Sequence, residues 1–376
     1  MRPATATAAA VTTVIGVGAA AAVAAGRYAS DAALKAPPRR PLPSDPKVTV
    51  HATAAGHVTL TRSLASLRPG TYGLRGPGVH AAVGPVTEGA GRTADTVVRR
   101  LLRVDRGDLT PGTRVRFTPE VYAGDPGTAL GLDHREVRVP GELGHSPAWF
   151  VPGARDTWVI CAHGLGTSRA QAMNVMPFLA ERRFPVLAIS YRGDEGAPRP
   201  REGLGHLGDT EWRDLDSAIG FALRGGAGRV ILYGWSTGAT MALRCVADSR
   251  HRMRISGLVL DSPVLDWQVT LRALAAARRT PAPLVPLAVR AAQGRTGLGR
   301  AKTAAADFPR GLDVPALLLH GPADTVAPWG ISRAVVAKRP DLISLHAVPD
   351  APHAAMWNAD PEGYEEALRR FITPLM

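Results

Sequence analysis

Two patterns of hydrophobic and polar positions divide the chain near residue 133. Residues 47 to about 130 alternate short β-like runs, such as Val48-Thr49-Val50 and Thr113-Arg114-Val115-Arg116-Phe117, with Gly and Pro turns, and one amphipathic segment lies around residues 96–104. This pattern predicts a small β-rich accessory region. It contains no constellation of residues that indicates chemistry, so we expect it to serve packing or contact with a partner.

From about Asp133 onward, apolar runs alternate with segments of helical length. This alternation predicts an α/β fold with a mostly parallel, eight-stranded sheet that helices cover on both faces. The predicted strands are residues 136–139, 148–151, 158–162, 186–190, 230–233, 255–260, 316–319 and 343–348.

The alternation stops for about fifty residues between Ser262 and Leu312, which predicts a helical lid over residues 263–312. Eight basic residues oppose two aspartates in this insert, and its leucines and valines provide an apolar side. We hypothesise a lid that admits acyl or aromatic groups and touches anionic lipid. An exposed helical pair whose arginines are merely solvated is the alternative.

The N-terminal 46 residues differ from both regions. Residues 8–26 carry no charge and would span roughly 28 Å as a helix, about one hydrocarbon core. They predict a single-pass membrane anchor, followed by a Pro-rich spacer, and the basic residues after the segment place most of the protein on the cytoplasmic side. A cleaved signal peptide, which would make the protein secreted, and a disordered Ala-rich leader are the alternatives. The chain thus divides into residues 1–46, 47–132 and 133–376.

The composition narrows the classes of partner. The net charge of +13 comes from 41 arginines and four lysines, with an excess of Ala, Gly and Pro beside them, which indicates a base-composition bias. No basic block is interleaved with aromatic residues, so nucleic acid is not an expected partner. No cofactor is expected, and no His, Cys, Asp or Glu cluster has the spacing of metal ligands. Cys161 and Cys245 lie in apolar segments and are expected to be buried thiols.

Ser236 is the predicted nucleophile. The apolar run at residues 230–233 ends at Gly234, and apolar residues recur at helical spacing after Gly238. Ser236 therefore lies in a sharp strand-to-helix turn, within the pattern Gly-x-Ser-x-Gly, that would push its hydroxyl out above the sheet.

A serine hydroxyl needs a base that a carboxylate orients, and His353 and Asp324 are the predicted pair. Each lies in a loop that follows a predicted strand, at the sheet edge where Ser236 also lies. The order Ser236, Asp324, His353 matches the nucleophile-acid-base order of one hydrolase architecture.

Asp261, Asp350 and His206 are the other candidates for these roles. Asp261, at the end of the strand at 255–260, is the alternative acid, whereas Asp350 is too close to His353 in sequence to orient its ring easily. His206, with Glu202 and Asp209 nearby in the chain, is expected to pack or to line the pocket.

With these motifs in place, residues from about 133 to 376 resemble the α/β-hydrolase fold. They are most similar to the serine aminopeptidase-like and Bem46-like hydrolases, which are often membrane-anchored. The residues that carry the resemblance are Gly234-Trp235-Ser236-Thr237-Gly238, His163-Gly164-Leu165-Gly166, His320-Gly321-Pro322-Ala323-Asp324 and His353.

The resemblance implies that the His-Gly pair after the third strand marks one half of an oxyanion hole. Gly164 and Gly166 would let the backbone turn so that the amide of Leu165 faces the site, and the amide of Thr237, at a helix N-terminus, would be the second donor. His163 itself is expected to be a structural turn histidine, with direct catalysis as the alternative.

The sequence thus predicts a serine hydrolase with a small acyl substrate, and a carboxylesterase first of all. A serine peptidase, perhaps an aminopeptidase, is the enzymatic alternative. A membrane-tethered binding protein that uses the fold without turnover is the alternative of another class.

Overall fold

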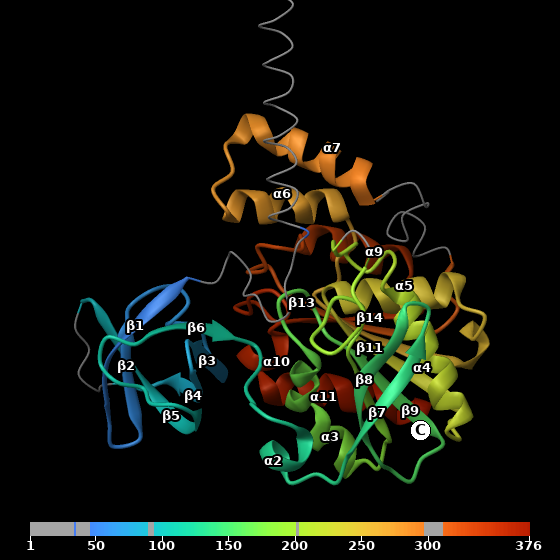
Figure 1. The fold of residues 1–376 in the computed structure, drawn as a ribbon, viewed down its shortest axis with the longest axis horizontal. Coiled ribbons are helices and arrows are strands. Elements are labelled where there is room, and N and C mark those ends of the chain that lie inside the picture. Colours follow the sequence, from blue (N-terminus) through green and yellow to red (C-terminus); the bar gives the residue numbers. More distant parts are fainter. Residues whose placement is uncertain (1–33, 35–45, 89–93, 201–202, 297–310) are drawn as a thin grey trace, which may run out of the picture.

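The structure is a computed structural model that describes residues 34, 46–88, 94–200, 203–296 and 311–376. Within these residues it contains a small closed barrel and a larger open sheet, joined by the short helix α2 (Pro126–Leu130). Figure 1 shows the barrel in blue to one side of the sheet, with the helix pair α6 and α7 above the sheet.

The barrel consists of six antiparallel strands in the closed order β1-β2-β5-β4-β3-β6. Their inward side chains are mainly Val, Leu and Ala, in agreement with the short alternating runs of the sequence. The strands are β1 (Lys47–Ala54), β2 (His57–Thr61), β3 (Tyr72–Gly76), β4 (Val79–Val86), β5 (Thr96–Arg106) and β6 (Arg114–Thr118).

The open sheet has eight strands in the order β14-β13-β12-β11-β9-β10-β8-β7. All neighbours run parallel except β8, which is antiparallel to both β7 and β10. The strands are β7 (Arg135–Gly141), β8 (Gly144–Val151), β9 (Thr157–Ala162), β10 (Val186–Ile189), β11 (Arg229–Trp235), β12 (Ile255–Asp261), β13 (Ala316–His320) and β14 (Ile343–Ala347). The predicted mostly parallel sheet of eight strands is confirmed.

Helices cover both faces of the sheet, so central strands such as β9 are buried along their whole length. One hydrophobic core holds side chains of α4, α5 and α9, and the core of the opposite face holds those of α3 and α11. The helices are α3 (Met176–Glu181), α4 (Trp212–Arg224), α5 (Thr237–Asp248), α6 (Trp267–Ala277), α7 (Val285–Thr296), α9 (Trp329–Lys338), α10 (Met356–Ala359) and α11 (Pro361–Ile372), with short 3-10 helices η1 (Arg169–Asn174), η2 (Arg252–Arg254), η3 (Ala282–Leu284) and η4 (Thr373–Leu375).

Helices α6 and α7 form the insert that the sequence predicts as a lid. Trp267 and Leu271 of α6 pack with Val289 and Ala292 of α7, and Leu34 joins the same cluster. Arg272 and Arg290 of these helices are exposed. Contact of the insert with lipid remains a prediction, and residues 297–310 of it lie outside the described part of the chain.

The barrel packs on α10, directly after the loop that carries His353. The Thr71 amide donates to the Asn358 carbonyl at 2.8 Å, and Asn358 Nδ2 donates back to the Thr71 carbonyl at 2.9 Å. Gly70 has a positive φ of 82°, and a Cβ there would lie 2.0 Å from the Asn358 carbonyl oxygen. Only glycine fits this close approach of the two backbones.

The predicted membrane anchor at residues 8–26 lies outside the described residues and stays a prediction. Among the residues described, no helix is both long and apolar enough to cross a bilayer.

Candidate active site

Ser236 sits in a strained turn between β11 and α5. It is a non-glycine residue with φ of 51° and ψ of −114°, and it is 1% exposed. A Cβ on Gly238 would lie 2.0 Å from the Ala162 carbonyl oxygen, and one on Gly234 would lie 2.4 Å from the backbone of α5. The two glycines therefore permit a turn that holds the serine hydroxyl above the sheet, at a backbone cost of about 1–3 kcal/mol.

His353 and Asp324 complete a chain of hydrogen bonds that begins at Ser236. His353 Nε2 lies 2.7 Å from Ser236 Oγ, and His353 Nδ1 lies 2.7 Å from Asp324 Oδ2. An ionised carboxylate only accepts, so Nδ1 carries a proton toward Asp324 and the neutral ring accepts from the serine hydroxyl at Nε2. The residues come from the ends of β11, β13 and β14, which meet at one edge of the sheet.

Asp324 is held in its ionised form by several donors. Its Oδ1 accepts from the Val326 and Ala327 amides, both at 2.8 Å, and its Oδ2 accepts from His320 Nε2 at 3.0 Å. Burial by itself would raise the pKa of Asp324, but the electrostatic interaction with His353 and the bonds from both histidines hold that pKa well below its usual value. The carboxylate is thus fixed in position and charge.

Asp261, the alternative acid, is hydrogen-bonded to Ser262, whereas Asp324 is hydrogen-bonded to the His353 ring. Its Oδ1 accepts from Ser262 Oγ at 2.8 Å, and that hydroxyl in turn accepts from the Ala354 amide at 2.9 Å. Burial raises the pKa of Asp261 to about 7. Asp261 therefore supports the loop beside His353, and Asp324 is the carboxylate that contacts the imidazole.

The amides of Leu165 and Thr237 border the serine. A Cβ on Gly164 would lie 2.9 Å from Ser236 Cβ, so the loop after β9 passes directly beside the predicted nucleophile. Within the described part of the chain, neither amide donates to a backbone carbonyl. Both donors are therefore available to an oxygen placed next to Ser236.

A buried glutamine ties this loop to the histidine loop. Gln171 Oε1 accepts from the Gly164 amide at 3.1 Å and from Thr167 Oγ1 at 2.8 Å. Its Nε2 donates to the Ala354 carbonyl at 2.9 Å. Gln171 thereby fixes the distance between the loop that carries Leu165 and the loop that carries His353.

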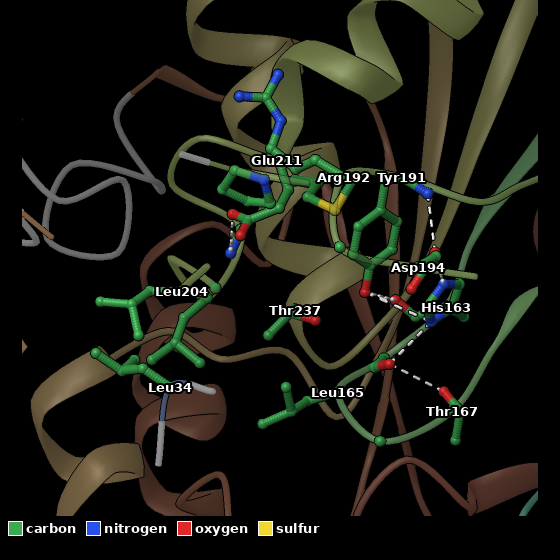
Figure 2. A pocket seen from close by; sticks show the side chains of 18 of the residues that line it. Leu34, His163, Leu165, Thr167, Tyr191, Arg192, Asp194, Leu204, Glu211 and Thr237 are labelled. Carbon is green, nitrogen blue, oxygen red and sulfur yellow. Dashed lines mark hydrogen bonds and ion pairs between the residues drawn. The ribbon is translucent and has the colours of Figure 1, made fainter. Parts of the chain in front are cut away.

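A cavity of about 340 Å³ opens on one side of the loop at residues 164–167. Leucines and a methionine form its apolar part, and Thr237 borders it (Figure 2). In that view Leu34 and Leu204 lie on the side away from His163 and Tyr191. The apolar residues that line the cavity include Leu34, Leu165, Leu204, Leu207 and Met241, and its charged or polar lining includes His163, Arg192, Asp194, Arg199 and Glu211.

Comparison with known proteins identifies the family of the chain. The model of the family described as "Alpha/beta hydrolase family" matches residues 159–374, which is more than half of the chain. The chain belongs to the alpha/beta hydrolase family. A second family model, a domain of unknown function (DUF8805), matches residues 49–118 of this hydrolase, the region of the barrel.

Individual relatives of the hydrolase are distant. The uncharacterized protein YfhR of Escherichia coli K12 is 26% identical over 284 residues, which cover 70% of this chain and 89% of YfhR. Among solved structures, the Pyrococcus furiosus esterase Pf2001 is 21% identical, covers 67% of this chain and 94% of its own, and superposes with a TM-score of 0.55. Such a likeness establishes the fold, and the family confirms the prediction of a hydrolase enzyme.

His163 of the hydrolase is held in the loop by hydrogen bonds and by ring stacking. Its Nε2 contacts Asp194 Oδ2 at 2.7 Å, its Nδ1 contacts the Gly164 carbonyl at 2.9 Å, and its ring stacks on Tyr191 with centroids 4.4 Å apart. Burial would lower its pKa, but Asp194 raises it above the usual value. His206 is likewise buried, with Nδ1 4.0 Å from Glu211.

No group of three or more His, Cys, Asp or Glu side chains among the described residues of the hydrolase is arranged to hold a metal ion. Cys161 in β9 and Cys245 in α5 are both buried.

Several residues at the site were not found by sequence reasoning. His320 was noted only as part of a motif, although it donates to Asp324 and contacts Ser332 Oγ at 2.7 Å through Nδ1. Gln171 and Ser262 carried no signal, because their bonds join loops that are distant in sequence. Glu120 was missed as well, since it lies in a region for which no chemistry was expected.

Glu120 links the barrel to the loop beside Ser236. Its Oε1 accepts from the Ser168 amide at 2.7 Å and from Ser168 Oγ at 2.6 Å, while Oε2 pairs with the Arg75 guanidinium. Burial would raise the pKa of Glu120, but Arg75 and Ser168 lower it. Besides packing, the barrel is thus linked to the site by the buried carboxylate of Glu120.

Proposed function

We propose that this enzyme is a carboxylesterase that works through an acyl-enzyme on Ser236. The observation that carries the proposal is the pair of 2.7 Å contacts that join Ser236, His353 and Asp324. Nucleophile, base and orienting carboxylate are then in the arrangement that acyl transfer requires.

The chemistry follows from these contacts. Ser236 Oγ attacks the ester carbonyl carbon while His353 Nε2 takes its proton, and the amides of Leu165 and Thr237 donate to the resulting oxyanion. The imidazolium then gives its proton to the departing alcohol oxygen as the C–O bond breaks. A water molecule, deprotonated by the same imidazole, hydrolyses the acyl-serine and regenerates the enzyme.

The apolar cavity is the proposed place for the acyl chain. It borders Thr237 and Leu165, whose amides hold the carbonyl oxygen, and leucines and a methionine form the apolar part of its wall. This apolar part favours a hydrocarbon chain over a polar one.

A peptidase is less well supported by the same cavity. An aminopeptidase needs a free carboxylate for the substrate ammonium group, but the two acidic side chains that line the cavity are engaged. Asp194 contacts His163 and accepts from the Tyr191 amide, and Glu211 accepts from the amides of His206 and Gly208.

Labelling with a fluorophosphonate probe tests the proposal. We expect the full chain to be labelled, the Ser236→Ala variant to lose the label, and the Ser344→Ala variant, altered at an exposed serine of β14, to keep it. A folded protein that is not labelled would indicate the binding protein that uses the fold without turnover. Hydrolysis of p-nitrophenyl esters without hydrolysis of aminoacyl amides would then separate esterase from peptidase.

A further inference from the structure

A second cavity lies on the other side of the loop at residues 165–167, between that loop and the barrel. His353 lines it, so it opens directly on the proposed active site. Its volume of about 50 Å³ is enough for a few water-sized atoms, the size of one small charged group. The barrel contributes Arg68, Tyr72, Arg75, Arg116, Phe117 and Thr118 to its lining.

The three arginines of this cavity differ in their partners. Arg75 is neutralised by Glu120, which also binds Ser168. In the described part of the chain, the guanidinium groups of Arg68 and Arg116 have neither an ion pair nor a hydrogen bond, although both side chains are only partly exposed. Unpaired cations that are partly withdrawn from water are costly, so their presence at a cavity indicates an anionic ligand.

Tyr72 gives independent evidence for a ligand. It is 1% exposed, and its hydroxyl has no hydrogen-bond partner among the described residues. Buried hydroxyl groups nearly always find a partner, so an orphan hydroxyl at a cavity wall indicates that the partner is a bound group. Because a phenol remains protonated at neutral pH, this hydroxyl can donate to an anion.

The surrounding charges favour an anion on balance. Asp350 is the acidic residue whose charge acts on Tyr72, and it is exposed at the surface. Glu120 is already occupied by Arg75 and Ser168. Arg68 and Arg116 are therefore the excess charge at the cavity.

The position of His353 assigns the cavity to one half of the substrate. In acyl transfer the imidazole hands its proton to the departing alcohol, so the alcohol lies on the side that the imidazole faces. The larger apolar cavity borders the Thr237 side and takes the acyl chain under the proposed function. The smaller cavity is left for the alcohol.

We infer that Arg68, Arg116 and Tyr72 form an anion subsite, and that the preferred ester substrates carry a carboxylate or phosphate on their alcohol half. The inference rests on the proposed function for the orientation of the ester. It gives the barrel a role in substrate selection that its sequence did not indicate.

A matched set of butyryl esters tests the inference on the full chain. The alcohols are glycolate, which is anionic, glycolamide, which is neutral and of nearly the same size, and 2-hydroxyethyl phosphate. Wild-type kcat/KM should be at least about tenfold higher for one of the two anionic esters than for the glycolamide ester, since hydrogen bonds to charged groups are the stronger ones. The better of the two anionic esters identifies the anion as carboxylate or phosphate. Equal rates for all three esters would overturn the inference.

Substitutions in the barrel test which residues cause the preference for anionic esters. Arg68→Gln and Arg116→Gln should each remove most of it, mainly by raising KM for the anionic ester, while the glycolamide ester changes less than about twofold. Arg106→Gln removes the same charge from an exposed barrel position outside the cavity and should keep the preference. Tyr72→Phe should weaken the preference without lowering Tm, because its hydroxyl has no protein partner to lose. A preference that survives both arginine substitutions would contradict the assignment.

Binding to the Ser236→Ala variant separates this inference from the proposed function. Isothermal titration calorimetry should show the anionic ester bound at least about tenfold more tightly than the glycolamide ester, and Arg68→Gln should abolish the difference. No difference in affinity overturns the anion subsite even if esters are hydrolysed. Conversely, loss of all esterase activity with the affinity difference intact would end the proposed function alone.

Discussion

The barrel and the open sheet bury their apolar side chains in different ways. The barrel closes on itself around one core, with antiparallel strands whose inward side chains alternate with outward ones. The sheet remains open, most of its strands run parallel, and helices bury a separate core on each face. Because parallel strands all end at the same edge, only the sheet gathers loops from distant parts of the chain at one place.

This difference explains where the reactive groups lie. Ser236, Asp324 and His353 follow strands of the sheet, and Leu165 follows another. The barrel has no such convergent edge, and it reaches the site through the cavity wall, the contacts of Glu120 with Ser168, and its packing on α10. A closed barrel thus contributes a surface beside the site, whereas the open sheet carries the residues of the proposed triad.

The largest effect is expected from the acid at the sheet edge. Asp324→Asn should lower kcat by about 10³–10⁴-fold, because an amide no longer fixes the histidine tautomer or stabilises the imidazolium. Asp261→Asn, one strand away, should lower kcat by less than about tenfold, since Asp261 acts through Ser262 and not on the ring. Ester hydrolysis of the two folded variants checks the prediction. The reverse ranking would make Asp261 the catalytic acid.

The stability of the sheet domain should depend on pH through Asp261. The folded-state pKa of Asp261 is about 7, against 3.8 for the ordinary carboxyl, so the folded protein holds this proton more tightly than the unfolded chain. The free energy of unfolding should therefore fall as the pH rises from about 4 to about 7, by up to about 4 kcal/mol from this group.

Urea denaturation at pH 5 and pH 8 measures this change. His163, whose pKa is also raised, loses stability in the same direction, so the difference between wild type and Asp261→Asn isolates the aspartate. The variant should show a flatter dependence on pH. Equal slopes for the two proteins would contradict the raised pKa.

Removing the contacts that Glu120 makes between the barrel and the sheet domain should cost about 2–3 kcal/mol of unfolding free energy. Glu120→Gln removes a fully buried carboxylate from Arg75 and Ser168 and leaves a cation without its partner. Glu136→Gln, which removes a surface ion pair with Arg169 in the sheet domain, should cost less than about 1 kcal/mol. Denaturant titration of both variants measures the two losses of unfolding free energy. Equal losses would show that the Glu120 contacts are no stronger than a surface ion pair.

The smallest effect is expected in the apolar cavity. Leu204→Phe fills part of the space assigned to the acyl chain, so kcat/KM for decanoyl esters should fall about tenfold while butyryl esters change less than about twofold. Measurement of the chain-length series provides its own control. An equal loss for all chain lengths would place the acyl chain elsewhere.

Much of the site could be predicted from the sequence because its signals are local. Gly234, Ser236 and Gly238 lie within five residues, and the strand endings before Asp324 and His353 are marked by apolar runs. Each loop could therefore be placed at the same edge of a parallel sheet without coordinates. The sequence favours Asp324 over Asp261 but leaves Asp261 open, since both lie at strand ends and only the distance to the His353 ring separates them.

What the sequence by itself determined is the α/β architecture and which serine and histidine meet at the sheet edge, because hydrophobic periodicity and turn chemistry act over a few residues. Only the tertiary structure decided that the barrel closes, that it packs beside His353, and that Arg68, Tyr72 and Arg116 meet at one cavity. These facts depend on which surfaces pack against each other at large sequence separation. Outward-facing arginines of a strand look the same in sequence whether they face water or a ligand.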